Sequence, residues 1–536
     1  MKLVINSREV EAVPDASLFD YAERVGVAVP TSCHKQGKCR ECLLEVVEGM
    51  EHLSERTPEE EHLQGDFRLA CRCQVAEDAG RVRCHTLRRA AMQIEERSMA
   101  LPVHGKEPLL DPAVTRDGDR ILLEGREIAR SSGPIHGLAL DLGTATVVLR
   151  LIDLETGERL ATSAFENPQR FGGSDVMARI AYDTTHRGRL LQRTLLGYLG
   201  HAIEELSAEP ETIYELVVAG NSTMRDLLFG LDVHPIGQKP YRSLTERELL
   251  EGKRSSTSLS VPARRLRLPI HPQARVQSLP LISGHVGADT AACLLAIDLA
   301  SEERLVALMD VGTNTELVLG NRDRILAASC PAGPAFEGGA ISCGMPALDG
   351  AIEGIRLDDD GRVDLSVIGD SAPEGICGSG LLELLSELLR TGHMNERGRL
   401  QSPDRFTVDA ERAISLSERD ISELAQAKGA NAAGLRIVLD SYGASLDDLD
   451  VFYLAGGFGR HLCLDAARNV GLIPALDDSK ILQVGNASVE GTSIALCSMT
   501  RRRELEALVS TISHVELESD PDFFDHFVSG CLLGPQ

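Results

Sequence analysis

The feature that most constrains the fold of this chain is an internal repeat, in which a short polar turn joins two apolar strands. In the first copy, an apolar run ends at Asp141, and D-L-G-T-A-T leads into a second apolar run. In the second copy, Asp310 begins D-V-G-T-N-T between two further apolar runs. The two aspartates lie 169 residues apart, and helix and strand patterns alternate between and after them. The repeat predicts a duplicated α/β domain over residues 135–536, with the two turns facing each other.

Each turn has the composition of a phosphate-binding loop. Tight turns of glycine and small hydroxyl residues expose backbone N–H groups that can bind phosphate oxygens, and an aspartate at a strand end can hold Mg²⁺ through water. One such motif is equally well explained as a hairpin turn, whereas a matched pair could hold the phosphates of ATP from both sides. A glycine-rich turn at 456–459 also follows an apolar strand and would let the backbone approach an adenosine.

Four other features are candidates for function, and three of them keep two interpretations each. The polar segment 166–172, ahead of Arg179, is a loop of the kind in which functional residues concentrate. The segment 219–224 is a structural turn, or a hinge and partner site. The segment 375–380 opens an apolar helix, where it either receives an anion or permits close packing. Glu316 either orients a water for ATP hydrolysis or is simply solvated.

The cysteines predict a metal centre near the N-terminus. Six of the thirteen cysteines fall within the first 84 residues, a density that in a reducing compartment indicates metal binding rather than disulfides. Cys33, Cys39 and Cys42 follow a C-x₅-C-x₂-C spacing, and Cys71 comes after 28 further residues. Three thiolates on one loop and a fourth on a distant strand suit a 2Fe–2S cluster. A zinc site and buried free thiols remain alternatives, and Cys73 is a conceivable substitute ligand for Cys71.

The element pattern divides the chain into three parts. Residues 1–88 read as strand, strand, helix, loop, strand, short helix and strand, which is the order of a β-grasp domain. Residues 89–134 carry little pattern and predict a linker with one helix and one hairpin. Residues 135–536 hold the duplicated domain. The predicted fold class is therefore α/β and multidomain.

The cysteine spacing resembles that of adrenodoxin-like ferredoxins, and the sequence R-L-A-C ending at Cys71 resembles the segment that carries their fourth ligand. His34, Lys35 and Arg40 stand where that family has glycines, while Gly37 is kept. Bulkier residues leave fewer open backbone N–H groups for the cluster sulfides, while the basic side chains add positive charge. We expect a raised reduction potential from these changes.

The paired turns and the later G-G-x-G resemble the superfamily of acetate and sugar kinases, heat-shock chaperones and actin (ASKHA). In that fold the two turns are phosphate motifs and the glycine-rich turn is the adenosine motif. The resemblance implies that ATP contacts Asp141, Gly143, Thr144 and Thr146, then Asp310, Gly312, Thr313 and Asn314, and finally Gly456, Gly457 and Phe458. It also implies Mg²⁺ at Asp141 and Asp310, with these two residues and Glu316 as the catalytic candidates.

The fusion of a ferredoxin domain with an ASKHA ATPase resembles the reductive activators of corrinoid proteins, over about 1–88 and 135–536. The motifs that carry this resemblance are D-L-G-T-A-T, E-N-P-Q, A-G-N-S-T-M, D-V-G-T-N-T-E, I-C-G-S-G and L-A-G-G-F-G. It implies ATP-dependent reduction of Co(II) to Co(I) in the corrinoid protein of a methyltransferase system, an upstream electron donor, and a homodimer. Because the linker is short, we expect the extra middle domain of some members to be missing or reduced.

Three other functions remain open. They are a small-molecule ASKHA kinase with a regulatory iron–sulfur domain, an electron-transfer module whose ATPase half has decayed, and an activator of 2-hydroxyacyl-CoA dehydratases or another low-potential reductase. A net charge of −26 and the absence of Trp argue against nucleic-acid and anionic-lipid partners. No apolar run approaches the roughly 20 residues that span a bilayer, and the first residues lack the apolar core of a signal peptide. We expect a cytoplasmic protein without a membrane partner.

Overall fold

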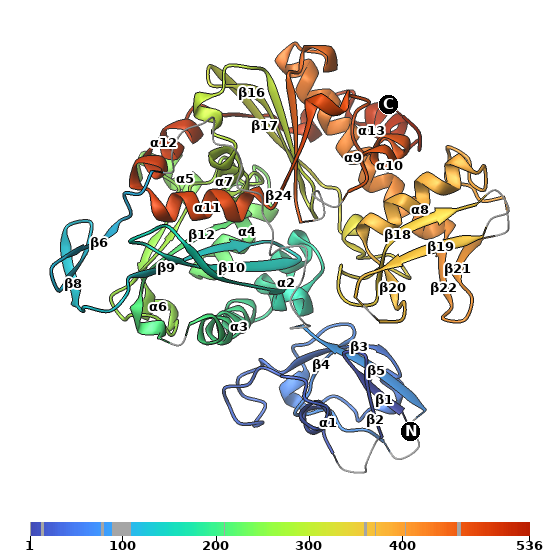
Figure 1. Cartoon of the computed structure of the whole chain (residues 1–536), viewed down its shortest axis with the longest axis horizontal. Coiled ribbons are helices and arrows are strands. Elements are labelled where there is room, and N and C mark those ends of the chain that lie inside the picture. Colours follow the sequence, from blue (N-terminus) through green and yellow to red (C-terminus); the bar gives the residue numbers. More distant parts are fainter. Residues whose placement is uncertain are drawn as a thin grey trace. The chain divides into compact units, whose positions relative to one another are not determined.

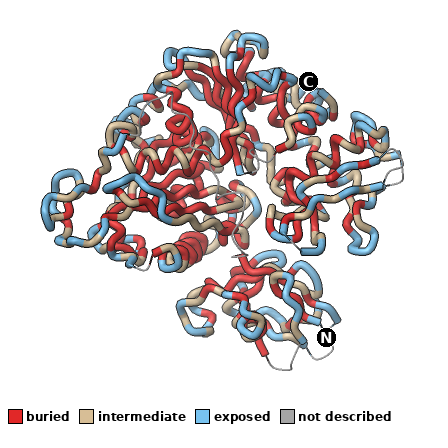
Figure 2. The backbone as a smooth tube through the Cα atoms, viewed as in Figure 1, coloured by how far each residue is buried: buried red, intermediate tan, exposed pale blue. Residues whose placement is uncertain are grey.

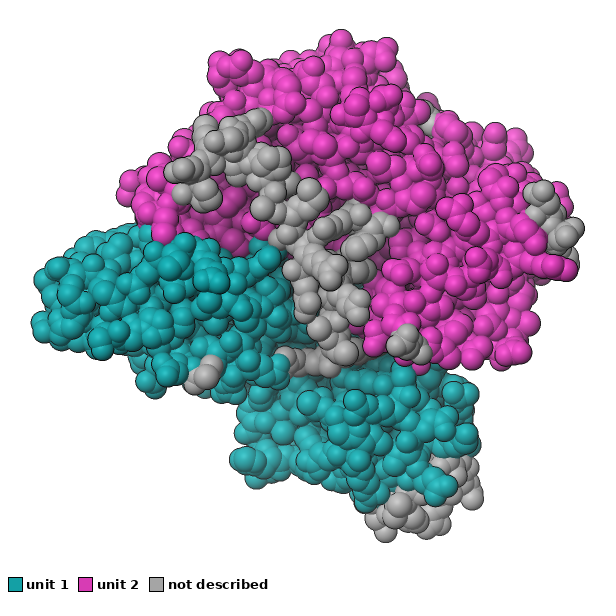
Figure 3. All heavy atoms as spheres, in the orientation of Figure 1, with its two compact units in different colours: residues 1–91, 112–218, 222–278 teal, residues 92–111, 219–221, 279–536 magenta. Residues whose placement is uncertain are grey.

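The structure is a computed structural model that divides into two compact units (Figure 3). Unit 1 comprises residues 1–91, 112–218 and 222–278, and unit 2 comprises residues 92–111, 219–221 and 279–536. The structure describes residues 2–11, 16–76, 80–87, 109–207, 209–358, 362–369, 371–401, 404–457 and 462–535. Among these residues, no helix is long and apolar enough to cross a bilayer.

The N-terminal domain, within residues 2–87 of unit 1, is a five-stranded sheet in the order β2-β1-β5-β3-β4 (Figure 1). Its strands are β1 (Lys2–Ile5), β2 (Arg8–Glu11), β3 (Leu43–Glu48), β4 (Phe67–Leu69) and β5 (Arg81–Thr86). Helix α1 (Leu18–Arg24) begins at a capping box, in which the side chains of Ser17 and Asp20 each bond the other's backbone N–H. Two 3₁₀ turns, η1 (Met50–His52) and η2 (Pro58–Glu60), complete the domain. The predicted β-grasp order is confirmed.

The described part of the expected linker, residues 109–134, contains a small antiparallel sheet. Its strands are β6 (Val114–Asp117), β7 (Arg120–Leu123) and β8 (Arg126–Arg130). Arg116 ties this sheet to the rest of unit 1, because its guanidinium bonds the Glu155 carboxylate at 2.8 Å and the Ser131 carbonyl at 2.6 Å. The sheet extends the expected hairpin by one strand. Residues 109–134 contain no helix, and residues 88–108 lie outside the described part.

The first copy of the repeat forms a six-stranded sheet in unit 1, in the order β11-β10-β9-β12-β14-β13. Its strands are β9 (His136–Leu142), β10 (Thr146–Asp153), β11 (Arg159–Glu166), β12 (Ile213–Gly220), β13 (Ser260–Pro262) and β14 (Arg275–Ser278). Its helices are α2 (Val176–Thr185), α3 (Leu190–Leu206), α4 (Ser222–Phe229), α5 (Leu244–Leu250) and α6 (Ala263–Leu266), with 3₁₀ turns η3 (Pro168–Gly172), η4 (Pro210–Thr212) and η5 (His234–Gly237). The apolar strands are buried, as Figure 2 shows.

The second copy forms a six-stranded sheet in unit 2, in the order β24-β23-β15-β16-β17-β25. Its strands are β15 (Val306–Asp310), β16 (Thr315–Asn321), β17 (Arg324–Cys330), β23 (Val451–Ala455), β24 (Ile481–Gly485) and β25 (Ser513–His514). The order β17-β16-β15-β23-β24 matches β11-β10-β9-β12-β14 strand for strand. The predicted duplication is therefore confirmed, and each polar turn joins the first two strands of its copy.

Helices and small sheets complete unit 2. The helices are α7 (Ala288–Ala296), α8 (Gly378–Arg390), α9 (Glu418–Tyr442), α10 (Leu464–Val470), α11 (Ala487–Cys497), α12 (Met499–Val509) and α13 (Phe523–Gly530). Strands β18 (Ala351–Leu357), β19 (Val363–Val367) and β20 (Gly375–Ile376) form one sheet, and β21 (Arg405–Asp409) pairs with β22 (Ile414–Ser417). The long helix α9 approaches β17 closely, because a Cβ at Gly434 would lie 2.2 Å from Cys330 Sγ.

Candidate functional site

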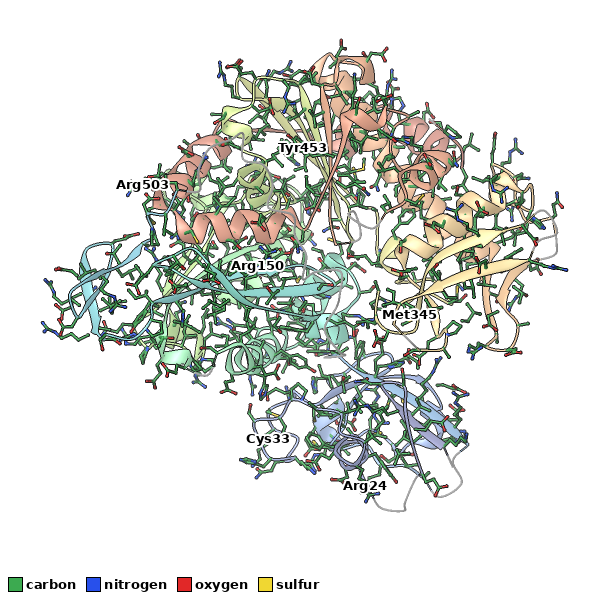
Figure 4. The ribbon with its side chains drawn as sticks, viewed as in Figure 1. Arg24, Cys33, Arg150, Met345, Tyr453 and Arg503 are labelled. Atoms are coloured by element: carbon green, nitrogen blue, oxygen red, sulfur yellow. The ribbon has the colours of Figure 1, made fainter. Side chains whose placement is uncertain are left out.

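The four cysteines predicted to hold a cluster lie in the N-terminal domain as two pairs. Cys42 Sγ lies 3.4 Å from Cys71 Sγ, and the thiols of Cys33 and Cys39 are hydrogen-bonded to each other. Figure 4 labels Cys33 on the loop between α1 and β3. A 2Fe–2S cluster takes two cysteines on each iron, so two pairs of thiols fit it. In the described ranges, nowhere do three or more His, Cys, Asp or Glu side chains converge as they would around a single metal ion.

The thiols differ in burial and acidity. The pKa of Cys71 is lowered to about 7, because the Cys42 thiol hydrogen-bonds to it, and the same contact raises the pKa of Cys42. Cys71 is only partly buried, whereas Cys73 is 0% exposed and belongs to the hydrophobic core. Burial raises the pKa of Cys73 to about 12. These differences favour Cys71 over Cys73 as the fourth ligand.

The cluster loop keeps the backbone of a glycine-rich loop although several glycines are replaced. His34, Lys35 and Arg40 have φ values of 51°, 64° and 65°, in the left-handed region that favours glycine. Each such non-glycine residue costs about 1–2 kcal/mol. At Gly37, with φ 72°, a Cβ would lie 2.4 Å from the Arg72 side chain, so a larger residue would be strained and would require that side chain to move. The loop is therefore strained, and its surroundings must hold it.

Two sets of charged contacts hold the loop and the fourth ligand. Lys35 Nζ lies 2.8 Å from Asp20 Oδ1, on helix α1, and this hydrogen bond lowers the pKa of Asp20 to about 2. On the other side, the buried Glu60 carboxylate accepts bonds from Arg68 Nε at 2.8 Å and from the backbone N–H of Leu69 at 2.9 Å. The first contact fixes the loop to α1, and the second fixes β4 just before Cys71.

The first phosphate turn is closed by a backbone bond and held from outside by two side chains. The Gly143 N–H donates to the Thr146 carbonyl at 3.0 Å. Asn167 Nδ2 donates to the Gly143 carbonyl at 2.8 Å, and Arg179 Nη2 donates to the Thr144 carbonyl at 2.7 Å. The Asn167 backbone N–H also bonds the Ala145 carbonyl, at 2.7 Å. Three successive carbonyls of the turn are thus fixed by two residues.

These contacts determine where the N–H groups of the turn point. In a trans peptide the C=O and the following N–H point in opposite directions. Fixing the carbonyls of Gly143 and Thr144 therefore turns the N–H groups of Thr144 and Ala145 away from Asn167 and Arg179. Oriented N–H groups of this kind suit a phosphate oxygen. The sequence marked the 166–172 loop as polar, but it did not show that Asn167 and Arg179 hold the turn.

The second phosphate turn is held by residues that sequence analysis missed. Asp310, at the end of β15, accepts a hydrogen bond from Cys293 Sγ at 3.5 Å. The Thr313 hydroxyl hydrogen-bonds to the Glu337 carboxylate, and the Thr313 carbonyl accepts the Gly333 N–H at 2.9 Å. Cys293 lies on α7 and Glu337 in a 3₁₀ turn, η7 (Ala335–Glu337), and neither carries a recognisable local motif.

Glu316 is buried rather than solvated, so the second of its two interpretations is wrong. Its side chain is 4% exposed, and Ser329 Oγ donates to its carboxyl at 3.4 Å. Burial, followed by the negative charges of Asp289 and Asp310, raises its pKa well above the usual range. Neighbouring carboxylates that disfavour each other's charge attract a cation, and Mg²⁺ in phosphate sites uses one or two carboxylates and keeps several waters. Asp310 therefore offers the type of ligand that Mg²⁺ uses in phosphate sites, with the remaining positions left to water and phosphate.

Close packing explains why glycine is required at some positions of the glycine-rich turns. Gly456 has φ 110°, and a Cβ there would lie 2.2 Å from the Val311 carbonyl of the second phosphate turn. At Gly380 a Cβ would lie 2.3 Å from the Ile352 carbonyl, which supports close packing of α8 against β18. Gly457 is exposed, and the predicted Phe458 lies outside the described residues.

The predicted nucleotide residues are brought together within each unit. Unit 1 holds the turn with Asp141, which is 9% exposed, and unit 2 holds the turn with Asp310 and the Gly456 turn. That the two turns face each other stays a prediction. Residues 219–221 of the A-G-N-S-T-M segment belong to unit 2, whereas the residues before and after them belong to unit 1. This position is compatible with the hinge interpretation of the segment.

Three family models match the chain. Residues 4–76 match the 2Fe–2S iron–sulfur cluster binding domain, residues 136–302 the RACo middle region, and residues 304–536 the C-terminal ASKHA domain of RACo. The expectation of a missing or reduced middle region is therefore wrong. The model of that region matches the first copy of the repeat, which the sequence had assigned wholly to the ATPase.

Proteins similar over two thirds or more of this chain have names concerned with corrinoids. The corrinoid activation enzyme RamQ of Eubacterium limosum is 26% identical, over 98% of this chain and 98% of that protein. The [Co(II) methylated amine-specific corrinoid protein] reductase of Methanosarcina barkeri is 27% identical, over 66% of this chain and 68% of that protein. A solved structure titled reductive activator for corrinoid, iron–sulfur protein superposes with a TM-score of 0.72 at 26% identity, covering 100% of this chain and 98% of that one.

Proposed function

Because the chain belongs to the RACo family, in which a 2Fe–2S domain is joined to an ASKHA domain, we propose that it is an ATP-dependent reductive activator of a corrinoid protein. The observation that carries this proposal is the presence of a candidate cluster site and a candidate nucleotide site in one chain. Two pairs of thiols suit a redox cluster. Two turns of a duplicated fold, held by side-chain hydrogen bonds, suit nucleotide phosphates. The full-length relatives named for corrinoid activation or reduction indicate the substrate class.

The proposed reaction transfers one electron to the cobalt of the partner, which changes from Co(II) to Co(I). When bound on Cys33, Cys39, Cys42 and Cys71, the cluster supplies a one-electron carrier. Co(I) corrinoid is a strong reductant, and each 100 mV of uphill potential costs about 2.3 kcal/mol per electron. ATP can offset that cost only if it binds two conformations of the protein or its complex with different affinity.

The residues of this chain bind the nucleotide and position it. Thr144 and Ala145 offer oriented N–H groups to phosphate oxygens, and the buried Arg179 fixes their orientation from the opposite side of the turn through the Thr144 carbonyl. Asp141 and Asp310 lie near the strand ends where a phosphate-bound Mg²⁺ would be held. Glu316, whose pKa is raised by burial and by the neighbouring carboxylates of Asp289 and Asp310, is the residue that could orient a water for hydrolysis. The full proposed nucleotide set is Asp141, Gly143, Thr144, Thr146, Asp310, Gly312, Thr313, Asn314, Gly456, Gly457 and Phe458.

The partners of the reaction are proposed from the family. They are the corrinoid protein of a methyltransferase system, an upstream electron donor, and a second copy of this chain in a homodimer.

The test is an anaerobic mixture of the protein, a reductant and a panel of Co(II) corrinoid proteins, with and without Mg–ATP. We expect the Co(I) absorption band with at least one partner, and only when ATP is present. If no corrinoid protein responds and a sugar or carboxylic acid is phosphorylated instead, the small-molecule kinase is the correct function. Equal Co(I) formation without ATP would contradict the coupling.

A further inference from the structure

The 166–172 loop contacts both the first phosphate turn and the N-terminal domain. Asn167 holds the Gly143 carbonyl at 2.8 Å. Three residues later, Arg170 Nη2 lies 3.0 Å from Glu45 Oε1, and Nη1 lies 3.3 Å from Oε2, in a bidentate ion pair. Glu45 lies on β3, three residues after the cluster ligand Cys42. Within unit 1, one short loop therefore connects the phosphate turn to the strand that follows the cluster cysteines.

Helix α2 makes a second connection of the same kind. Arg179 holds the Thr144 carbonyl at 2.7 Å. Nearly one helical turn later, the Tyr182 hydroxyl donates to the His62 carbonyl of the N-terminal domain at 2.6 Å. His62 lies two residues after Glu60, whose carboxylate fixes β4 ahead of Cys71. The two connections therefore end on segments next to two different cluster ligands.

The contact surface between these segments is buried and polar. Tyr182 is 3% exposed and His62 7%, and the His62 ring packs edge-on against Phe171 with centroids 5.7 Å apart. Helix α3 adds a third contact, in which His201 Nε2 lies 3.1 Å from the Glu41 carboxylate, just before Cys42. Burial strengthens hydrogen bonds such as these, so the contacts hold the N-terminal domain in a defined orientation on the middle region.

We propose that the Asn167–Arg170 and Arg179–Tyr182 connections form a latch, which links nucleotide on the first phosphate turn to docking of the cluster domain. The proposal rests on the proposed function, because it requires nucleotide at that turn. Asn167 and Arg179 hold the carbonyls of the peptide planes whose N–H groups would bind phosphate. Docking therefore pre-orients the turn for nucleotide, and nucleotide in return stabilises the docked state. Such a linkage is reciprocal and is typically worth about fivefold or more in affinity.

The test uses the full-length protein with its cluster and a non-hydrolysable ATP analogue, followed by hydrogen–deuterium exchange. The latch variant combines Glu45→Gln and Tyr182→Phe, which remove the ion pair and the hydroxyl donor without touching the phosphate turn. The control is Glu48→Gln on the same strand, whose carboxylate lies 3.9 Å from Arg81 and 3.8 Å from Arg83.

In the unmodified protein, we expect the analogue to slow exchange at 141–146 and also at 42–48 and 60–67, by about fivefold. In the latch variant, the analogue should still protect 141–146 but no longer protect 42–48 and 60–67, and its affinity should fall by the same factor. Glu48→Gln should behave like the unmodified protein.

The outcomes separate the latch from the nucleotide site. Protection of 141–146 without any change at 42–48 and 60–67 in the unmodified protein would overturn the latch and leave the proposed function standing. No response at 141–146 would overturn both. A Glu48→Gln protein that loses the coupling as fully as the latch variant would also overturn the latch, because the effect would then not depend on these two connections.

Discussion

Removing the Asn167 side chain should weaken nucleotide binding without unfolding the protein. Asn167 is 0% exposed, and its Nδ2 donates to the Gly143 carbonyl. In Asn167→Ala this buried carbonyl loses its side-chain donor, at a cost of about 1–2 kcal/mol. This free-energy cost weakens phosphate binding, because the freed peptide plane no longer holds the Thr144 N–H in place. One to two kcal/mol corresponds to roughly a 5- to 30-fold loss of affinity.

Calorimetric titration with a non-hydrolysable ATP analogue measures this loss, and thermal unfolding of the same samples measures stability. The control is Asn469→Ala on helix α10, which also removes a side-chain amide donor, in this case one bonded to Ser386 Oγ at 3.3 Å. Its affinity should equal that of the unmodified protein. The reasoning is refuted if Asn167→Ala binds the analogue normally while its melting temperature falls, since Asn167 would then support only the fold.

Three further predictions concern the cluster domain. Cys39→Ser should lower the iron content well below about two per chain and bleach the visible spectrum, whereas Cys73→Ser should leave both unchanged; equal damage from both would contradict the ligand assignment. His34→Gly should raise the thermal stability of the cluster-loaded protein, because it relieves a left-handed residue worth about 1 kcal/mol, and a lower melting temperature would show that the side chain contributes contacts. The pKa of Asp20, lowered to about 2 by Lys35, predicts stability that is present above its unfolded value near pH 4 and lost as the pH falls toward 2. Denaturation of Asp20→Asn should therefore differ from the unmodified protein at pH 6 and converge with it near pH 2, and a constant difference would contradict the ionic origin.

The features readable from the sequence were those with a short, periodic or repeated signature. The paired turns beginning at Asp141 and Asp310 predicted the duplication because strand, turn and strand are all local. The spacing of the cysteines predicted two-iron chemistry because three of the four ligands sit close together along the chain. The order of elements in the N-terminal domain also followed from local patterns, and its short helix begins at the Thr57–Glu60 capping box in the structure.

The remaining features depend on long-range contacts that no local pattern records. Asn167 and Arg179 reach carbonyls 24 and 35 residues away. One of the two interpretations of Glu316 was that it is solvated, because a charged residue in a strand usually faces water, but both faces of β16 are covered and its carboxyl is buried. The docking of the N-terminal domain through Glu45 and Arg170, 125 residues apart, could not be seen from either segment alone.

The central claim is that the cluster delivers its electron to a corrinoid cobalt only when nucleotide is present. The most direct measurement is a single turnover, in which the protein is reduced anaerobically, freed of excess reductant and mixed with a Co(II) corrinoid partner. With Mg–ATP, the account predicts that cluster oxidation and Co(I) appearance have the same rate, with about one Co(I) formed per cluster oxidised. Co(I) that appears at the same rate without ATP, or without cluster oxidation, would contradict it.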